Sequence, residues 1–129
     1  MPKIKKVKEK SISWWIKKCD KEFSLLVRSI GSCQYCGNRE SLQTAHIVGR
    51  SNKTLRWNPL NAICLCTRCH IFKFHRSPLE FIDFLGSRYP ERMVYLRVKR
   101  NKITNRTIED YKALLEAIKE RNIKFLTAT

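Results

Sequence analysis

The spacing of apolar residues predicts an α-helix near the N-terminus. Residues at spacings of three and four share one face of this helix: Trp15, Cys19, Phe23, Leu26 and Ile30. This period matches the turn of an α-helix, so that face is expected to be buried. Ser11 or Ser13 can cap its start, and Gly31 ends the pattern. We expect the aromatic face to pack against residues 31–77, with Cys19 as a small buried apolar side chain.

The middle of the chain carries the pattern of a hairpin followed by a helix. Residues 41–48 (SLQTAHIV) alternate and contain β-branched side chains, which predicts a strand that ends near His46. Residues 49–59 form a polar loop, and residues 60–65 return as a second short strand. Residues 67–76 are expected to be helical.

A helix is predicted to start at Pro78, after this central region. Ser77 and Glu80 match a capping box, and Pro78 occupies the first helical position. The buried face of this helix is expected to contain four apolar residues: Phe81, Ile82, Phe84 and Leu85.

Two more helices complete the prediction. One begins at Pro90 and continues through Val98, and the last is capped by Thr107. Apolar residues share one side of this last helix: Ile108, Tyr111, Leu114, Leu115 and Ile118. The pattern predicts an α+β fold with a small core, about residues 31–77, between an N-terminal helix and a helical C-terminal part, about residues 78–125.

The composition fits one folded domain. The chain has 129 residues, of which 43% are apolar, so it can bury a modest core and would gain from a bound metal ion. Residues 1–12 are expected to form a flexible basic arm, and residues 13–129 the domain. No apolar run is long enough to span a bilayer, and the N-terminus lacks the apolar centre of a secretory signal. We therefore expect a cytoplasmic protein without a membrane partner, whose cysteines stay reduced.

The charge balance indicates a polyanionic partner. The chain has 27 Lys and Arg against 11 Asp and Glu, a net charge of +16. Such an excess attracts nucleic acid, chiefly through the release of counterions from phosphates. A basic soluble surface or a ribosome-associated protein would show the same balance. In so short a chain, nucleic acid is the favoured interpretation.

Four cysteines are arranged as two metal-binding knuckles. Cys33 and Cys36 form one C-x2-C pair and Cys66 and Cys69 the other, with 29 residues between the pairs. In a reduced protein this spacing predicts a tetrahedral zinc site. Because four thiolates leave no open position for water, the zinc would be structural. Cys64 could compete as a ligand, but its spacing fits a buried strand residue better.

Three polar residues beside the knuckles suit phosphodiester hydrolysis. This reaction needs a base to activate water and a cation to stabilise charge on the phosphate and the leaving oxygen. His46 suits the base, because a neutral imidazole accepts a proton near physiological pH. His70 suits a ligand of a separate Mg²⁺ or Mn²⁺ ion. Asn61 could orient His46 by hydrogen bonding or help to hold that cation.

The ordered motifs resemble the zinc-containing HNH endonucleases, which have a ββα-metal core. The resemblance covers about residues 33–76 and rests on CQYCG, AHI and NPLNAICLCTRCH. It implies that His46 is the general base, that Asn61 is structural or metal-binding, and that His70 is a metal ligand. HNH enzymes commonly have Asp or another polar residue before the first His, where it helps to bind the catalytic metal. Ala45 cannot do so, which puts the metal geometry in doubt.

A second resemblance covers more of the chain through weaker positions. The segments DKEFSLLVRS, AHIVGR and LRWNPLN, with the helical region after the second knuckle, are similar to the phage NinG (Rap) recombination proteins. Those proteins are associated with cleavage of branched recombination intermediates. Their pattern has Gly at the position of Ala45 and Asn at that of His70, so this site is closer to the general HNH form at His70. A phage origin would place the protein in the cytoplasm of a bacterial host.

Basic side chains outside the motif are predicted to contact DNA. They lie in the polar loop, at the end of the helix after the knuckles, and in the basic run 97–106: Arg50, Lys53, Arg56, His75, Arg76, Arg97, Lys99, Arg100 and Lys102. His75 lies five residues beyond His70, about one and a half turns of an α-helix. We therefore interpret it as a DNA contact or surface residue and not as a ligand.

The sequence leaves three functions open. The first is a divalent-metal-dependent HNH endonuclease acting on duplex or branched DNA in phage recombination or repair, such as Holliday junctions. The second is a nicking or homing-type HNH nuclease with a preferred sequence. The third is a catalytically silent zinc protein that binds DNA or RNA. A homodimer is expected if both strands of a junction are cut symmetrically, whereas a nickase could act as a monomer.

Overall fold

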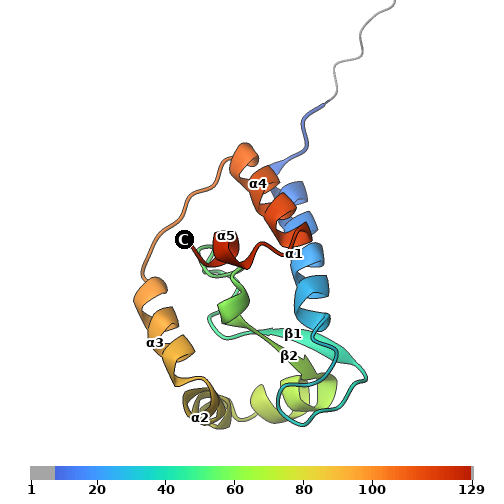
Figure 1. Cartoon of the computed structure of the whole chain (residues 1–129), viewed down its shortest axis with the longest axis vertical. Coiled ribbons are helices and arrows are strands. Elements are labelled where there is room, and N and C mark those ends of the chain that lie inside the picture. The colour runs from blue at the N-terminus through green and yellow to red at the C-terminus, as the bar shows by residue number, and fades with distance from the viewer. Residues whose placement is uncertain (1–7, 129) are drawn as a thin grey trace, which may run out of the picture.

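The computed structural model describes residues 8–128 and shows a small α+β fold (Figure 1). A two-stranded sheet lies between α1 and the pair of helices α2 and α3 (Figure 1). Within the described residues the elements are α1 (Ile12–Arg28), β1 (Leu42–His46), η1 (Pro59–Asn61), β2 (Ala62–Cys66), η2 (Arg68–Phe74), α2 (Pro78–Arg88), α3 (Pro90–Lys99), α4 (Ile108–Lys119) and α5 (Ile123–Thr127). Residues 1–7 of the predicted basic arm lie outside the described residues.

Helix α1 confirms the first prediction, with one correction to its buried face. Ser11 is the cap, and its side chain accepts a hydrogen bond from the backbone N–H of Trp14 at 3.2 Å. Cys19 and Phe23 are buried as expected, but Val27 completes the buried face. Ile30 is 51% exposed and lies beyond the helix. The helix ends before Ile30, so the periodic pattern does not continue there.

The hairpin has the predicted strands, and its register separates two faces. The strands are antiparallel, with Leu42 opposite Cys66 and His46 opposite Ala62. Because successive side chains of a strand alternate, Thr44 and His46 share one face and Ala45 lies on the other. Thr44 hydrogen-bonds Ser24 of α1 at 3.1 Å, which identifies the first face as the one turned toward α1.

Two hydrophobic clusters lie on opposite faces of this hairpin. The first joins α1, α4 and α5 to Trp57, Ala62 and Cys64. The second joins the cysteine knuckles to Ile63, Leu65, η2 and α2. Helix α1 therefore packs on the region of residues 31–77, as predicted, but on the face of the hairpin opposite the cysteine knuckles. Alternation along β2 sends Cys64 toward α1 and its neighbours toward the knuckles.

The C-terminal helices are present; the predicted Thr107 cap is confirmed, and the predicted Ser77 capping box is wrong. Thr107 caps α4 in a reciprocal box with Asp110, whereas Ser77 makes no side-chain bond at the start of α2. Tyr111, Leu114 and Ile118 of α4 are buried as expected. Leu115 is partly buried against the same cluster.

Two details of these helices depart from the sequence pattern. On α2 only Leu85 is fully buried, while Ile82 is 50% exposed. A further helix, α5, was not predicted; Asn122 caps it, and Leu126 is its buried residue. In the part of the chain that the structure covers, no helix combines the length and the apolar character needed to traverse a bilayer.

Candidate functional site

The four predicted zinc ligands meet at one point. The sulfur atoms of Cys33, Cys36, Cys66 and Cys69 all lie within 4.8 Å of one another. The Cys36 and Cys66 sulfurs are 3.7 Å apart. Four thiolates at the usual Zn–S distance would have S–S separations of about 3.8 Å. The group is therefore close enough to bind a metal ion, and its chemistry and spacing fit a structural zinc.

The turn after Cys33 prepares this donor set. Gly37 has a φ of +82°, a conformation that side chains rarely adopt, and its N–H bonds the Cys33 carbonyl at 2.9 Å. Burial raises the pKa of the Cys33 thiol, but backbone hydrogen bonds from Cys36, Cys66 and Tyr35 outweigh it and lower that pKa to about 6. Such donors favour the thiolate that binds zinc.

The other two cysteines lie outside the cluster, as predicted. Cys64 is fully buried on the α1 side of the hairpin. Cys19 is also fully buried, with its sulfur 3.8 Å from the Tyr111 carbonyl oxygen, and burial raises its pKa to about 12. A thiol with so high a pKa stays protonated and behaves as a small apolar side chain.

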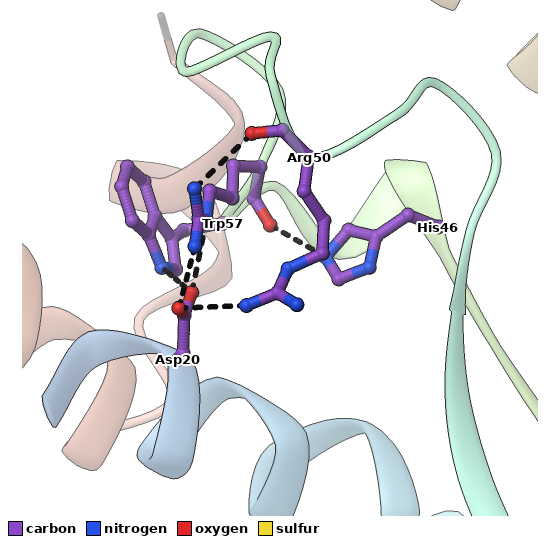
Figure 2. Close-up of polar contacts among 5 residues, drawn as sticks. Asp20, His46, Arg50 and Trp57 are labelled. Atoms are coloured by element: carbon purple, nitrogen blue, oxygen red, sulfur yellow. Dashed lines mark hydrogen bonds and ion pairs between the residues drawn. The ribbon is translucent and has the colours of Figure 1, made fainter. Parts of the chain in front are cut away.

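His46 is held at one ring nitrogen and open at the other. Its Nε2 lies 3.0 Å from the backbone carbonyl oxygen of Arg56 (Figure 2). A carbonyl can only accept, so Nε2 carries the proton and Nδ1 keeps its lone pair. Nδ1 has no hydrogen-bond partner in the described part of the chain and is not sealed in the interior. Burial lowers the pKa of His46, which favours the neutral ring at pH 7.

A cleft of about 390 Å³ opens beside His46. It lies between α1 and β1, and its walls are Asp20, Phe23, Ser24, Arg28, Leu42, Gln43, Thr44, His46 and Arg50. Arg28 and Arg50 bring two positive charges to this cleft, and Asp20, which pairs with Arg50 at 3.0 Å, brings one negative charge. Arg50 keeps 59% of its side chain exposed, so its guanidinium is accessible to an anion.

Asn61 clamps the polar loop and does not touch His46. Its Oδ1 accepts the N–H of Val48 at 2.7 Å, and its Nδ2 donates to the carbonyls of Val48 at 3.0 Å and Leu55 at 3.1 Å. The residue is fully buried. These bonds hold the amide inside the loop, and it makes no bond to His46, which corrects the prediction that Asn61 orients His46 by a hydrogen bond. Its role as a metal ligand stays a prediction.

His70 and His75 lie side by side because η2 is a π-helix. The N–H of His75 bonds the His70 carbonyl at 3.1 Å, an i to i+5 bond, and the ring centroids are 4.7 Å apart. An α-helix was predicted here, which would have separated the two rings. The His70 Nδ1 donates to Gln43 Oε1 at 2.7 Å, so its Nε2 lone pair is free. Burial, and then the charges of His75 and His46, lower the pKa of His70.

Asp20 is the residue that sequence reasoning missed. Its carboxylate accepts bonds from Arg56 Nε at 3.0 Å and Nη2 at 2.7 Å, Arg50 Nη2 at 3.0 Å and Trp57 Nε1 at 2.9 Å (Figure 2). Partial burial raises the pKa of Asp20, but Arg56 and Arg50 outweigh burial and lower it. The only hint in the sequence is an acidic residue beside Cys19, next to the predicted buried face.

The basic side chains predicted to contact DNA differ in how accessible the structure leaves them. Arg56 is paired with Asp20 and only 16% exposed at its side chain, so it is less accessible than the exposed side chains among the predicted DNA contacts. Lys53, Arg100 and Lys102 line a groove of about 330 Å³ between the polar loop and residues 100–106. Arg76 and Arg97 are exposed, and Lys99 is half-buried. Their contact with DNA stays a prediction.

Trp57 does not offer a face for base stacking. It is buried, and its ring packs edge-on against Tyr111 with centroids 5.7 Å apart. Trp15 is partly buried against the α1 cluster, as expected.

Comparison with protein-family models, curated proteins and solved structures finds no match. The functional proposal therefore rests on the sequence and on the geometry of the site.

Proposed function

We propose that the chain is a divalent-metal-dependent endonuclease of the HNH type that hydrolyses DNA phosphodiester bonds. The observation that carries this proposal is the setting of His46. One ring nitrogen is fixed on a backbone carbonyl, and the ring lines a cleft with two arginines. A neutral imidazole fixed in this way is suited to general base catalysis.

His46 would act through Nδ1. The bond from Nε2 to the Arg56 carbonyl leaves Nδ1 as the only acceptor on the ring. With its pKa lowered by burial, the ring is neutral at pH 7 and can take a proton from a water molecule in the cleft. The Arg56 carbonyl then stabilises the charged ring that results, because both nitrogens carry protons in that state.

The cation would be held by the imidazole of His70 on η2, whose Nε2 lone pair is free. A Mg²⁺ or Mn²⁺ ion bound here would stabilise negative charge on the phosphate and the leaving oxygen. Gln43 fixes the His70 ring and also lines the cleft of His46, so it links the two parts of the site.

The charge of the cleft supports a phosphodiester substrate. Arg28 and Arg50 lie on its walls, and the chain as a whole carries +16. Guanidinium groups pair with phosphate oxygens in a two-pronged geometry. Branched DNA is the proposed substrate, by the resemblance to the phage recombination proteins.

A second candidate is a zinc-stabilised protein that binds nucleic acid without cutting it. Ala45 supplies no carboxylate to the site. Within residues 8–128, the four cysteines are the only group of three or more His, Cys, Asp or Glu side chains placed to hold an ion. A cation held only by His70 would need water or phosphate oxygens for its remaining positions.

The test compares wild type with His46→Ala. Relaxation of supercoiled plasmid and cleavage of linear, flapped and four-way DNA would be measured with Mg²⁺ or Mn²⁺, beside equilibrium binding to the same DNA. We expect wild type to cut and His46→Ala to bind without cutting, while Glu116→Gln, an exposed control on α4, behaves as wild type. If His46→Ala cuts as well as wild type, the assignment of His46 as the general base is wrong. If wild type binds DNA without cutting it, the second candidate is favoured.

A further inference from the structure

The carbonyl that holds His46 belongs to a residue whose side chain is anchored on another element. Arg56 presents its backbone oxygen to His46 and its guanidinium to Asp20 on α1 (Figure 2). The two residues of this anchor are separated by 36 positions in the chain. Helix α1 precedes the hairpin and is not part of the region between the knuckles.

The anchor is stronger than an ordinary surface ion pair. Both oxygens of Asp20 receive bonds from Arg56, at 3.0 Å and 2.7 Å, in a two-pronged geometry. The side chains are only 22% and 16% exposed, so water screens the pair less than it screens exposed charges. Trp57, the next residue, adds a bond to Asp20 at 2.9 Å. Two consecutive residues of the loop are therefore fixed to α1 through one carboxylate.

The rest of the loop is held independently of Asp20. Asn61 bonds Val48 and Leu55, Asn52 donates to the Arg100 carbonyl at 2.9 Å, and Thr54 donates to the Lys102 carbonyl at 2.7 Å. The loop has several anchors, so loss of Asp20 is expected to leave the fold intact. Arg56 itself also donates its N–H to the Asn52 carbonyl at 3.0 Å and its Nη1 to the Arg50 carbonyl at 3.2 Å. Asp20 adds the two-pronged bond that joins the Arg56 side chain to α1, beside the point where the Arg56 carbonyl meets His46.

We propose that Asp20 is a positioning residue for His46, acting through the Arg56 side chain to aim the Arg56 carbonyl at Nε2. The role in catalysis rests on the proposed nuclease function, whereas the positioning of the ring does not. The same carboxylate holds one nitrogen of Arg50, which lines the cleft beside His46. Asp20 thus helps to fix the relative positions of the His46 ring and the Arg50 guanidinium.

The test is the pair Asp20→Asn and Glu22→Gln. Both remove one negative charge from α1, but Glu22 makes no side-chain hydrogen bond or ion pair among the described residues. The readout is the Nε2 proton and nitrogen resonance of His46 in the zinc-loaded protein, assigned with His46→Ala; the chain has three histidines. Steady-state cleavage of a DNA duplex with Mn²⁺ and the melting temperature are measured in parallel.

In Asp20→Asn we expect the Nε2 proton signal to broaden by exchange with water and kcat to fall roughly ten- to a hundredfold at a similar KM. Glu22→Gln should keep the signal and stay within about twofold of wild type in kcat. Should Asp20→Asn fold poorly, Arg56→Lys gives the same test, since it keeps the charge and the carbonyl but not the two-pronged contact.

The outcomes separate the two proposals. An unchanged His46 signal and rate in Asp20→Asn and Arg56→Lys would overturn the positioning role and leave the nuclease proposal standing. A signal lost in both variants, with no cutting by wild type under any condition, would support the positioning of the ring and overturn the nuclease. A signal lost equally in Glu22→Gln would show a general effect of charge and also defeat the positioning role.

Discussion

Replacing Asn61 by aspartate separates a structural role from a metal-binding role. The two side chains have nearly the same shape, and a carboxylate binds a hard cation better than a carboxamide does. A metal site would therefore tolerate this change. The clamp seen here would not, because Nδ2 donates to the carbonyls of Val48 at 3.0 Å and Leu55 at 3.1 Å. Aspartate has no donor at that position when ionised.

The expected loss of stability follows from these bonds. Two donated bonds contribute about 2 kcal/mol together, at about 1 kcal/mol each. An ionised carboxylate facing two carbonyl oxygens in the interior adds a cost of several kcal/mol. Protonation of this carboxylate limits the cost to about 1.4 kcal/mol for each unit by which the pH exceeds its unfolded-state pKa. We expect the unfolding free energy of Asn61→Asp to fall by roughly 3 to 5 kcal/mol at pH 7. That is a large part of the stability of an ordinary domain.

The loss should depend on pH in a defined direction. Burial disfavours the ionised form, so the pKa of the introduced aspartate is raised in the folded state. The folded variant then holds a proton more tightly than the unfolded chain, and its deficit relative to wild type grows as the pH rises above about 4. Near pH 4 the protonated carboxyl can donate one bond, and the deficit should shrink to about 2 kcal/mol or less.

Urea unfolding at pH 7 and pH 4.5, followed by tryptophan fluorescence, measures both values. The matched control is Asn38→Asp. Asn38 is exposed and uses only its Oδ1, which accepts the N–H of Glu40 at 3.1 Å, so aspartate keeps the bond. An Asn61→Asp protein as stable as wild type, with tighter binding of Mn²⁺, would refute the clamp and support Asn61 as a ligand.

Two further predictions concern the metal and the pH. Cys69→Ala should lose its zinc, measured by elemental analysis, and lose much of its stability, because a metal bound only to the folded state adds its binding energy to folding; Cys64→Ala, equally buried, should keep one zinc per chain and cost about 1 kcal/mol. Acid should weaken the fold in two stages. The lowered pKa values of His46 and His70 mean that stability starts to fall below about pH 6.5, as the unfolded imidazoles take up protons. The lowered pKa of Asp20 adds a second loss below about pH 4, as the carboxylate is protonated and its ion pairs break. Urea midpoints from pH 8 to pH 3 check this, and a flat profile between pH 8 and pH 5 would contradict the burial of the two rings.

Features with a local cause were predictable from the sequence. Strand β1 follows from alternation and strand β2 from a short apolar run, and the cysteine pairs follow from a spacing that already fits a turn. The helix starts at Ser11 and Thr107 follow from side-chain caps that reach three residues ahead, and the start at Pro90 follows from the fixed φ of proline at the first helical position. In each case the interacting groups are neighbours in the chain, so their spacing contains the information.

Other features depended on how distant parts of the chain pack. The type of helix at η2 decides whether His75 lies beside His70, and a segment of seven residues is too short for periodicity to tell a π-helix from an α-helix. Asn61 has a fixed place in the motif, but the carbonyls that occupy its amide are chosen by the path of the loop.

The sequence by itself determined a basic chain with a hairpin, a four-thiolate metal site and a histidine at the end of the first strand. Only the tertiary structure decided how that histidine is held, because its ring is bonded to the Arg56 carbonyl and the Arg56 side chain donates to Asp20, 36 positions away. Such a contact arises when the α1 face packs on one side of the hairpin while the knuckles occupy the other. The spacing of residues along the chain does not reveal that packing, so the geometry of the site could be seen only in the folded structure.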